Sequence, residues 1–378
     1  MSESDVVRLV LTTGSRTWCG GFGGDDAPRA VMDSMNMPIK KRGVITGWGE
    51  KANYVGSEAA WKVGQHPDLV FPIQRGVIQD MEGVELLLHM MLYNELRVDP
   101  KEHSLLLNDP PLSSWVDKER MTQLLFETFE IPSLLLASEA FLSLMAAGRG
   151  SGIVLYSGHG VTYAAPIYEC HLLPSATQRI PLGGEDVQKF LANLLTREGL
   201  YLHHPNSMEI VRTLKENHAY VAQDFQHQVD ASRTSTAGEV VYALPDGQTV
   251  TVNDCLFRCT ETLFSPTLLH RQGPSLQQLV YDSVTQCDPH FRKILFSNVI
   301  ITGGNTMFPG FAERLKSELQ AMVPSTVLPH VVADPARKYA PWVGGSIASE
   351  LEASWNRYVT KEEYEEWGPA LVSRRSIL

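Results

Sequence analysis

Two apolar segments that end in glycine hairpins constrain the fold of this chain more than any other feature. One spans residues 9–22 and turns at Gly14, and the other spans residues 153–163 and turns at Gly158. Each has the pattern of a β-strand leading into a turn whose backbone N–H groups could bind a phosphate. Because the segments match and one lies near the start of each half, the sequence predicts an internal duplication facing one cleft.

The side chains that a nucleoside triphosphate needs are missing from both hairpins. Hydrated Mg²⁺ requires a carboxylate, and the phosphate oxygens usually require a cation. Neither hairpin carries a carboxylate at its turn. The sequence therefore predicts turns with the backbone shape of a phosphate-binding site but without the side chains that would bind a metal ion.

Composition permits large cores and excludes several classes of function. The 378 residues, 43% of them hydrophobic, predict two domains or one bilobed body. A net charge of −11 argues against a general nucleic-acid binder. No run approaches the roughly 18 apolar residues of a membrane span, and the polar start of the chain does not read as a signal peptide. We therefore expect a protein of the cytosol or nucleus.

The cysteines give no metal signature. Five scattered cysteines fit a reducing compartment. Cys255 and Cys259 are separated by three residues, but no second ligand pair follows them. We therefore expect no zinc site.

Strand and helix patterns alternate along the chain and predict an α/β fold. Continuous apolar runs predict buried strands at residues 154–155 and 297–301. Apolar residues at helical spacing predict helices at 80–96, 119–129 and 310–323.

Motifs spread along essentially the whole chain, in order and at near-constant spacing, resemble those of the actin family. They lie at residues 24–31, 93–98, 121–129, 244–248, 303–310 and 337–346. The resemblance implies a two-lobed actin-like fold of duplicated ribonuclease H-like domains with a nucleotide cleft between the lobes. It places the base of the first lobe at 1–34, 74–148 and 340–378, with 35–73 as its outer extension. It places the base of the second lobe at 149–184 and 274–339, with 185–273 as its outer extension.

The resemblance also implies a set of nucleotide contacts. They fall on Gly14, Ser15, Gly158, Gly160, Gly184, Arg212, Lys215, Glu216, Gly303, Gly304, Asn305, Met307, Phe308 and Lys338. Two readings stay open. In one, ADP or ATP binds through its adenosine end without magnesium, with Arg16 and His159 offsetting phosphate charge. In the other, Arg16, Trp18 and Tyr156 fill the phosphate space and no nucleotide enters.

Residues that actins use for hydrolysis are replaced in this chain. By resemblance, the family has Asp at the positions of Thr12, Tyr156 and His159, and Lys at that of Cys19. Glu139 replaces the Gln that positions the attacking water. Because phosphoryl transfer depends on this positioning and charge neutralisation, we expect no catalytic residue, no metal ligand and no ATPase activity.

Two surfaces that actins use for assembly have changed to different extents. Val44, Ile45 and Trp48 keep the apolar tip of the loop that inserts into the next subunit, so head-to-tail contact is expected. In the loop that forms the lateral plug of actins, His270 and Arg271 add polarity, so weaker strand-to-strand pairing is expected.

The resemblance further implies a groove that docks partner helices in actins. Its residues here are Met145, Cys170, His171, Ala348, Leu351 and Arg357. A cation at Arg357 would reject a partner that buries leucine there, so we expect the usual actin-binding helices to be lost.

Three functions remain open from the sequence. The first is a structural actin-like subunit without ATPase activity, built with protein partners into a cytoplasmic assembly such as a ciliary axoneme or a dynactin-like complex. The second is a filament-forming actin with residual ATP binding and slow hydrolysis. The third is a nuclear actin-related subunit of a chromatin complex. None of the three requires nucleic acid or a membrane as a direct partner.

Overall fold

A computed structural model describes residues 7–38, 53–62, 69–200, 207–234, 240–243 and 249–376, and the chain divides into two compact units. Unit 1 consists of Met1–Ser151, Ile167–Pro174 and Tyr339–Leu378, and unit 2 of Gly152–Pro166 and Ser175–Lys338. The finer division of each lobe into a base and an outer extension stays a prediction. Within the described ranges, no helix is both long and apolar enough to span a membrane.

Unit 1 is built from short strands and eight-to-eleven-residue helices, with several shorter helices beside them. Its strands are β1 (Leu9–Thr12), β2 (Thr17–Phe22), β3 (Ala30–Asp33), β4 (Asn36–Pro38), β5 (Asn53–Val55), β6 (Ile73–Gln74), β7 (Val77–Ile78), β8 (Leu105–Asp109), β9 (Ser133–Ser138), β12 (His171–Leu172) and β18 (Val359–Thr360). Its helices are α1 (Ser57–Lys62), α2 (Met81–His89), α3 (Trp115–Gln123), α4 (Glu139–Ala146), α12 (Ala340–Glu350), α13 (Glu352–Trp355), α14 (Lys361–Trp367) and α15 (Ala370–Arg375).

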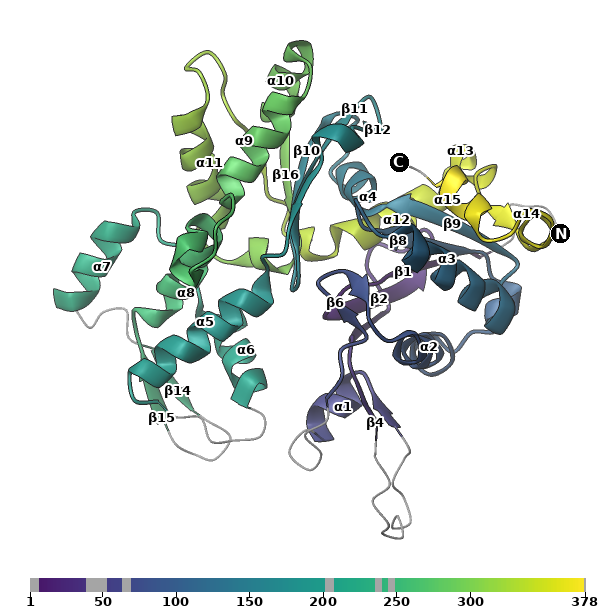
Figure 1. Cartoon of the computed structure of the whole chain (residues 1–378), viewed down its shortest axis with the longest axis horizontal. Helices are drawn as coiled ribbons and strands as arrows, with labels where there is room; N and C mark the ends of the chain where they lie inside the picture. The colour runs from purple at the N-terminus through teal and green to yellow at the C-terminus, as the bar shows by residue number, and fades with distance from the viewer. Residues whose placement is uncertain are drawn as a thin grey trace, which may run out of the picture. The chain divides into compact units, whose positions relative to one another are not determined.

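The main sheet of unit 1 has the described strand order β18-β9-β8-β1-β2-β3 and carries helices on both faces (Figure 1). Leu9 and Leu11 of β1 belong to the core cluster that also contains residues of α2 and α3. Val10, between them, points to the opposite face, where its side chain lies beside α12 and its carbonyl accepts a hydrogen bond from Trp342 at 3.0 Å. This alternation is the two-residue period of a strand with both faces buried.

Helix α12 lies against α4 through a contact that only glycine permits. A Cβ atom on Gly344 would come within 1.8 Å of the carbonyl oxygen of Leu142. The two helix backbones therefore pack directly on each other behind β1 and β8. This packing fixes α4, which begins at Glu139, at the end of β9.

The predicted helices are confirmed, with two local changes. The pattern at 80–96 forms α2, begun by the Asp80 carboxylate accepting from Gly83 N–H at 3.1 Å, and then a π-helical segment at Met90–Leu96. The pattern at 119–129 forms the later part of α3 and a second π-helical segment, Leu124–Thr128. The pattern at 310–323 forms a single helix over Phe311–Met322 in unit 2.

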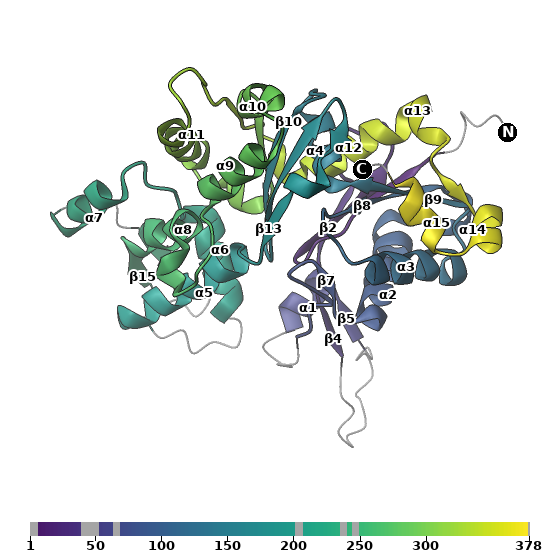
Figure 2. The same ribbon diagram turned by 45° about the horizontal axis from the view of Figure 1, so that its top comes forward.

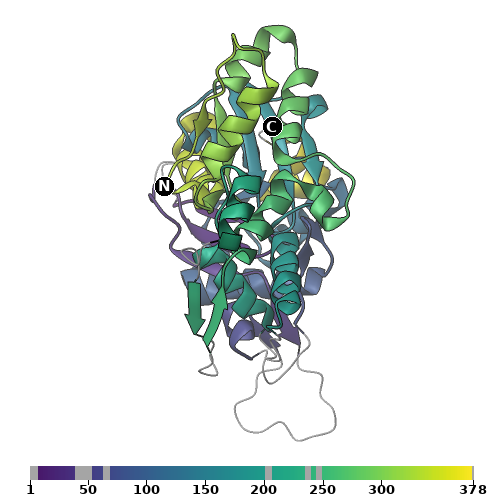
Figure 3. The ribbon, with the colours of Figure 1, turned by 90° about the vertical axis from the view of Figure 1, so that its left-hand side faces the viewer.

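Unit 2 has its own sheet and a separate group of helices (Figure 2). Its strands are β10 (Gly152–Ser157), β11 (Thr162–Tyr168), β13 (Gln178–Ile180), β14 (Val240–Ala243), β15 (Thr249–Val252), β16 (Val299–Thr302) and β17 (Val331–Val332). Its helices are α5 (Gly184–Arg197), α6 (Ser207–His218), α7 (Phe225–Thr234), α8 (Cys255–Phe264), α9 (Leu276–Gln286), α10 (Pro289–Phe296) and α11 (Phe311–Met322). Figure 3 shows the β14 and β15 pair as two neighbouring arrows beside the helices of this unit.

The two main sheets share one plan, which agrees with the predicted duplication. In unit 1, β1 forms a hairpin with β2 and pairs in parallel with β8, which pairs in parallel with β9. In unit 2, β10 leads into β11 and pairs in parallel with β16, which pairs in parallel with β17. Each glycine hairpin therefore lies at the carboxyl end of the first strand of its unit, a common ligand position in α/β sheets.

Candidate functional site

The turn of the first hairpin is tied to its own unit by hydrogen bonds. Thr13 N–H donates to the Asn108 side chain at 2.6 Å, and the Trp18 indole donates to the Gly14 carbonyl at 3.1 Å. The Ser15 hydroxyl accepts from Gly76 N–H at 3.0 Å. The Gly14 carbonyl and the Ser15 hydroxyl, in two residues predicted to contact nucleotide, therefore have partners inside unit 1.

Arg16 faces the interior of unit 1. The residue is only 7% exposed, and its guanidinium lies 3.3 Å from the Asp33 carboxylate and over the ring of Phe71. A cation already neutralised by a nearby carboxylate gains less from a phosphate than an unpaired one does. The expectation that Arg16 offsets phosphate charge therefore has little support in this geometry.

The replaced residues of the first hairpin lie together in the structure. Thr12 and Cys19 are opposite each other in the pairing of β1 with β2, and both are buried. Glu139, at the start of α4, is also buried, and its carboxylate lies 3.5 Å from the Asn108 amide nitrogen. The same Asn108 side chain binds Thr13, so one amide links the end of β8 to the residues that directly follow β1 and β9.

An aromatic pair closes the turn of the second hairpin. The rings of Tyr156 and Tyr163 are stacked, with centroids 4.9 Å apart and planes 7° apart, and Tyr163 is completely buried. The Tyr156 ring also covers Gly158, where an added Cβ atom would come within 2.6 Å of it. The Gly158 N–H donates to the Val161 carbonyl at 3.0 Å, so this amide already has a partner within the hairpin. The space beside Gly158 is thus occupied by the chain's own phenol ring.

Asn305 and the Gly158 carbonyl together join three segments of unit 2. The Asn305 amide nitrogen donates to the Ser157 hydroxyl at 3.1 Å and to the Gly158 carbonyl at 2.8 Å, and the residue is 4% exposed. The Gly158 carbonyl also accepts from Gly184 N–H at 2.9 Å. Gly303 makes this approach feasible, because it has φ of +91° and lies against the Ser157 backbone.

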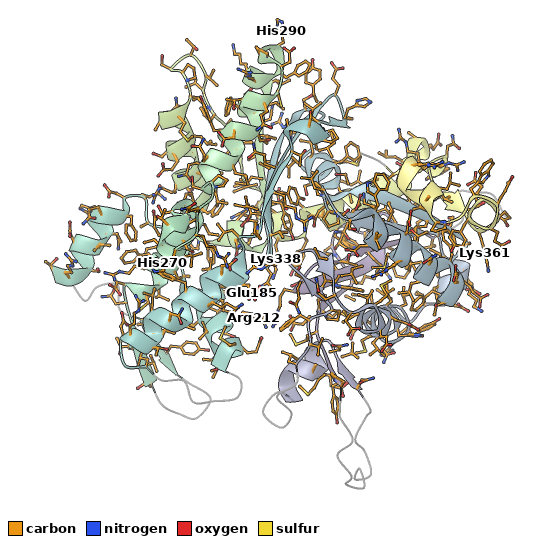
Figure 4. The ribbon with its side chains drawn as sticks, in the orientation of Figure 1. Glu185, Arg212, His270, His290, Lys338 and Lys361 are labelled. Atoms are coloured by element: carbon orange, nitrogen blue, oxygen red, sulfur yellow. The ribbon has the colours of Figure 1, made fainter. Side chains whose placement is uncertain are left out.

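Lys215 takes part in the same inward network. Its ammonium group donates to the Gly184 carbonyl at 3.1 Å, and the residue is only 4% exposed. Its role in the structure is therefore to join α6 to the start of α5. In contrast, Arg212 forms a ladder on the surface of α6 with Glu209 at 2.9 Å and Glu216 at 3.6 Å (Figure 4 labels Arg212).

The predicted nucleotide residues of unit 2 thus fall into two groups. The inward group, buried and engaged in packing or hydrogen bonds, consists of Gly158, Gly160, Gly184, Lys215, Gly303, Asn305 and Phe308. The outward group, at least partly exposed, consists of Arg212, Glu216, Gly304, Met307 and Lys338. Within the outward group, no atom of the described chain lies within 4 Å of a Cβ built on Gly304, and Met307 is 37% exposed.

Sequence patterns missed two residues that organise this network. Ser157 accepts from Asn305 and bonds the Thr162 hydroxyl at 3.0 Å. Asp186 accepts from Gly183 N–H at 3.0 Å and so closes the start of α5. The sequence does contain a signal for Asp186, because it follows Gly183 by three residues, which is the spacing of a helix capping box.

The structure describes the residues of the predicted partner groove but not those of the predicted intersubunit loop tip. Val44, Ile45 and Trp48 lie outside the described residues. In the predicted groove, Ala348 is completely buried, so it contributes to helix packing and not to a surface. Cys170, His171, Leu351 and Arg357 are exposed and Met145 is half-buried.

Two carboxylates and a thiol lie close together in unit 2. Among the described residues, potential metal-binding atoms of Glu198, Asp254 and Cys255 lie within 4.8 Å of one another. The Cys255 thiol donates to the Glu198 carboxylate at 3.0 Å, and burial raises the pKa of that thiol. Burial also raises the pKa of Cys259 to about 12. Because metals bind the thiolate, the raised pKa disfavours the form of Cys255 that would bind one.

Comparison with known families gives one match. The family model described as Actin matches residues 3–377, nearly the whole chain. The match includes both hairpins and every residue assigned above to nucleotide contact.

Replacing Asn305 with alanine should destabilise unit 2 by about 2 kcal/mol, because two buried hydrogen bonds are lost at roughly 1 kcal/mol each. Denaturant unfolding measures this change. Asn298→Ala is the matched control, since its amide makes one exposed bond to Ile294, and should change stability by less than about 0.5 kcal/mol. Equal effects of the two substitutions would show that Asn305 does not hold the hairpin.

Proposed function

Because the chain belongs to the actin family of nucleotide-binding cytoskeletal proteins, we propose that it is a structural actin-like subunit that does not hydrolyse ATP. It works as one component of a larger cytoskeletal assembly. In that assembly it provides a binding surface for other subunits. Its conformation does not change with the hydrolysis of a triphosphate.

The observation that carries this proposal is the Tyr156 ring over Gly158. In the family that the chain resembles, an aspartate at this position serves the metal. Here an uncharged phenol is stacked on buried Tyr163 and fills the space beside the turn. Mg²⁺ takes oxygen ligands in near-octahedral geometry and needs carboxylates to hold it. The residues at the second hairpin do not fit a Mg²⁺-triphosphate.

The first hairpin supports the same proposal. The position of the family's phosphate-binding lysine is Cys19, which is buried opposite Thr12. The cation nearest to the turn in sequence, Arg16, is paired with Asp33. Since catalysis of phosphoryl transfer depends on charge neutralisation and positioning, neither hairpin offers the groups for it.

Unit 2 nevertheless keeps an open surface at the predicted adenosine end. Glu216 and Met307 are exposed, and Gly304 leaves room beside the chain. The polar groups of Arg212 and Glu216 and the apolar Met307 are residue types that suit the lining of a nucleoside site. We therefore include in the proposal a bound adenine nucleotide, ADP in preference to ATP, held without magnesium.

Denaturing the purified protein should release one adenine nucleotide per chain, mostly ADP, measured by chromatography of the extract. Glu216→Ala should lower both this occupancy and the melting temperature, because a ligand that binds only the native state stabilises it. Glu365→Ala, an exposed glutamate of α14, is the control and should change neither. An extract without nucleotide would contradict the bound state and favour a cleft filled by side chains.

The partners in this proposal are proteins, among them actin-like subunits that contact the chain head to tail. A head-to-tail contact that does not close produces an open filament unless a partner caps it. A subunit of a defined complex therefore needs dedicated neighbours. The proposed location is the cytoplasm and its cytoskeleton, with a ciliary axoneme or a dynactin-like complex as examples of such an assembly.

The isolated protein should stay monomeric or form small oligomers at concentrations where actins polymerise, measured by sedimentation. Val44→Asp or Ile45→Asp should release it from its cellular complex, since a charge opposes burial of the apolar loop tip. Val241→Asp is the matched control, because Val241 is already 67% exposed, and should leave the complex intact. Long two-stranded filaments of the pure protein in physiological salt would overturn the proposal.

A further inference from the structure

Arg271 follows a short helical turn, Pro266–Leu269, in a surface loop of unit 2, and its side chain bends back onto the body of that unit. Its guanidinium lies 2.8 Å from the Asp186 carboxylate and donates to the Pro181 carbonyl at 3.0 Å. The Asp186 side chain is only 3% exposed. The sequence predicts that Arg271 adds surface polarity, but the structure gives it a buried partner within its own unit.

Asp186 connects this loop to the start of α5. One carboxylate oxygen pairs with Arg271, and the other accepts from Gly183 N–H at 3.0 Å. A carboxylate with partners on both oxygens holds both in fixed positions, and a buried charge that loses its partner is costly. The loop and the helix start are therefore positioned by the same side chain.

The start of α5 in turn supports the second hairpin. Gly184 N–H donates to the Gly158 carbonyl at 2.9 Å, and Glu185 N–H donates to the His159 carbonyl at 2.8 Å. Gly183 lies so close to this turn that an added Cβ atom would come within 2.4 Å of the His159 carbonyl oxygen. Figure 4 labels Glu185 on α5 and His270, which precedes Arg271 in the loop.

We propose that Arg271 is a positioning residue that anchors the loop at 266–274 to Asp186 and, through the start of α5, fixes the hairpin at Gly158 and His159. The loop and the hairpin are then energetically coupled, so a change at either one alters the stability of the other. This coupling acts within unit 2 and does not depend on whether a nucleotide is bound.

Hydrogen exchange followed by mass spectrometry tests the proposal on the full chain. Arg271→Ala should speed exchange about tenfold at two places, the loop amides of Leu268 and His270 and the distant amides of Gly184 and Glu185. Amides of β1 in unit 1 serve as the internal reference, since they lie outside unit 2. Arg271→Lys, which keeps the charge, should restore most of the protection.

Arg233→Ala is the matched control, because Arg233 pairs with Asp230 on the surface and its side chain is 69% exposed. It should leave all four amides unchanged. If Arg271→Ala speeds exchange only in the loop, the coupling to the hairpin is wrong. If it changes neither place, the anchor itself is wrong. Should Arg271→Ala fail to fold, Arg271→Met, which keeps the apolar part of the side chain, replaces it with the same expected result.

Discussion

The carbonyl of Gly158 is the group on which the second hairpin depends. It accepts hydrogen bonds from Asn305 at 2.8 Å and from Gly184 at 2.9 Å, and these donors come from segments far apart in the sequence. Buried carbonyls that lose their donors carry a desolvation cost, so this point holds three segments together. Lys215 adds a fourth segment by donating to the Gly184 carbonyl. Groups of the protein from four segments thus stabilise the turn.

The structural role that we propose requires a hairpin whose shape does not depend on a bound phosphate. A turn that binds phosphate must leave its amides open to the ligand, and its stability then depends partly on that ligand. Here Tyr156 covers the glycine, and the amide of Gly158 donates to Val161. Unit 1 uses a different set of contacts, in which the Asn108 side chain binds Thr13 and the Ser15 hydroxyl binds Gly76. In both units, groups of the protein itself make these contacts to the hairpin.

The sequence predicted the hairpins, the α/β class and the three helices because these depend on local patterns of apolar residues. It did not predict the direction of single side chains. Lys215 and Arg212 lie one turn apart on α6, yet only Lys215 turns inward to a backbone carbonyl. Arg271 looked like a surface charge, and its pairing with buried Asp186 depends on a contact across 85 positions of the chain. Ala348 was expected in a groove and is buried, because neighbouring Gly344 brings α12 directly onto α4. Such outcomes depend on tertiary packing, which a residue's type and spacing do not encode.

The absence of ATP hydrolysis is the central claim, and steady-state phosphate release measures it most directly. Purified protein should release inorganic phosphate from ATP no faster with Mg²⁺ than with a chelator, and no faster than a heat-inactivated blank. This result follows from the Tyr156 ring at the second hairpin and from the pairing of Arg16 with Asp33 at the first. A turnover comparable to that of ordinary actins, abolished by the chelator, would contradict the account, because it would require metal chemistry from residues that the structure commits to packing.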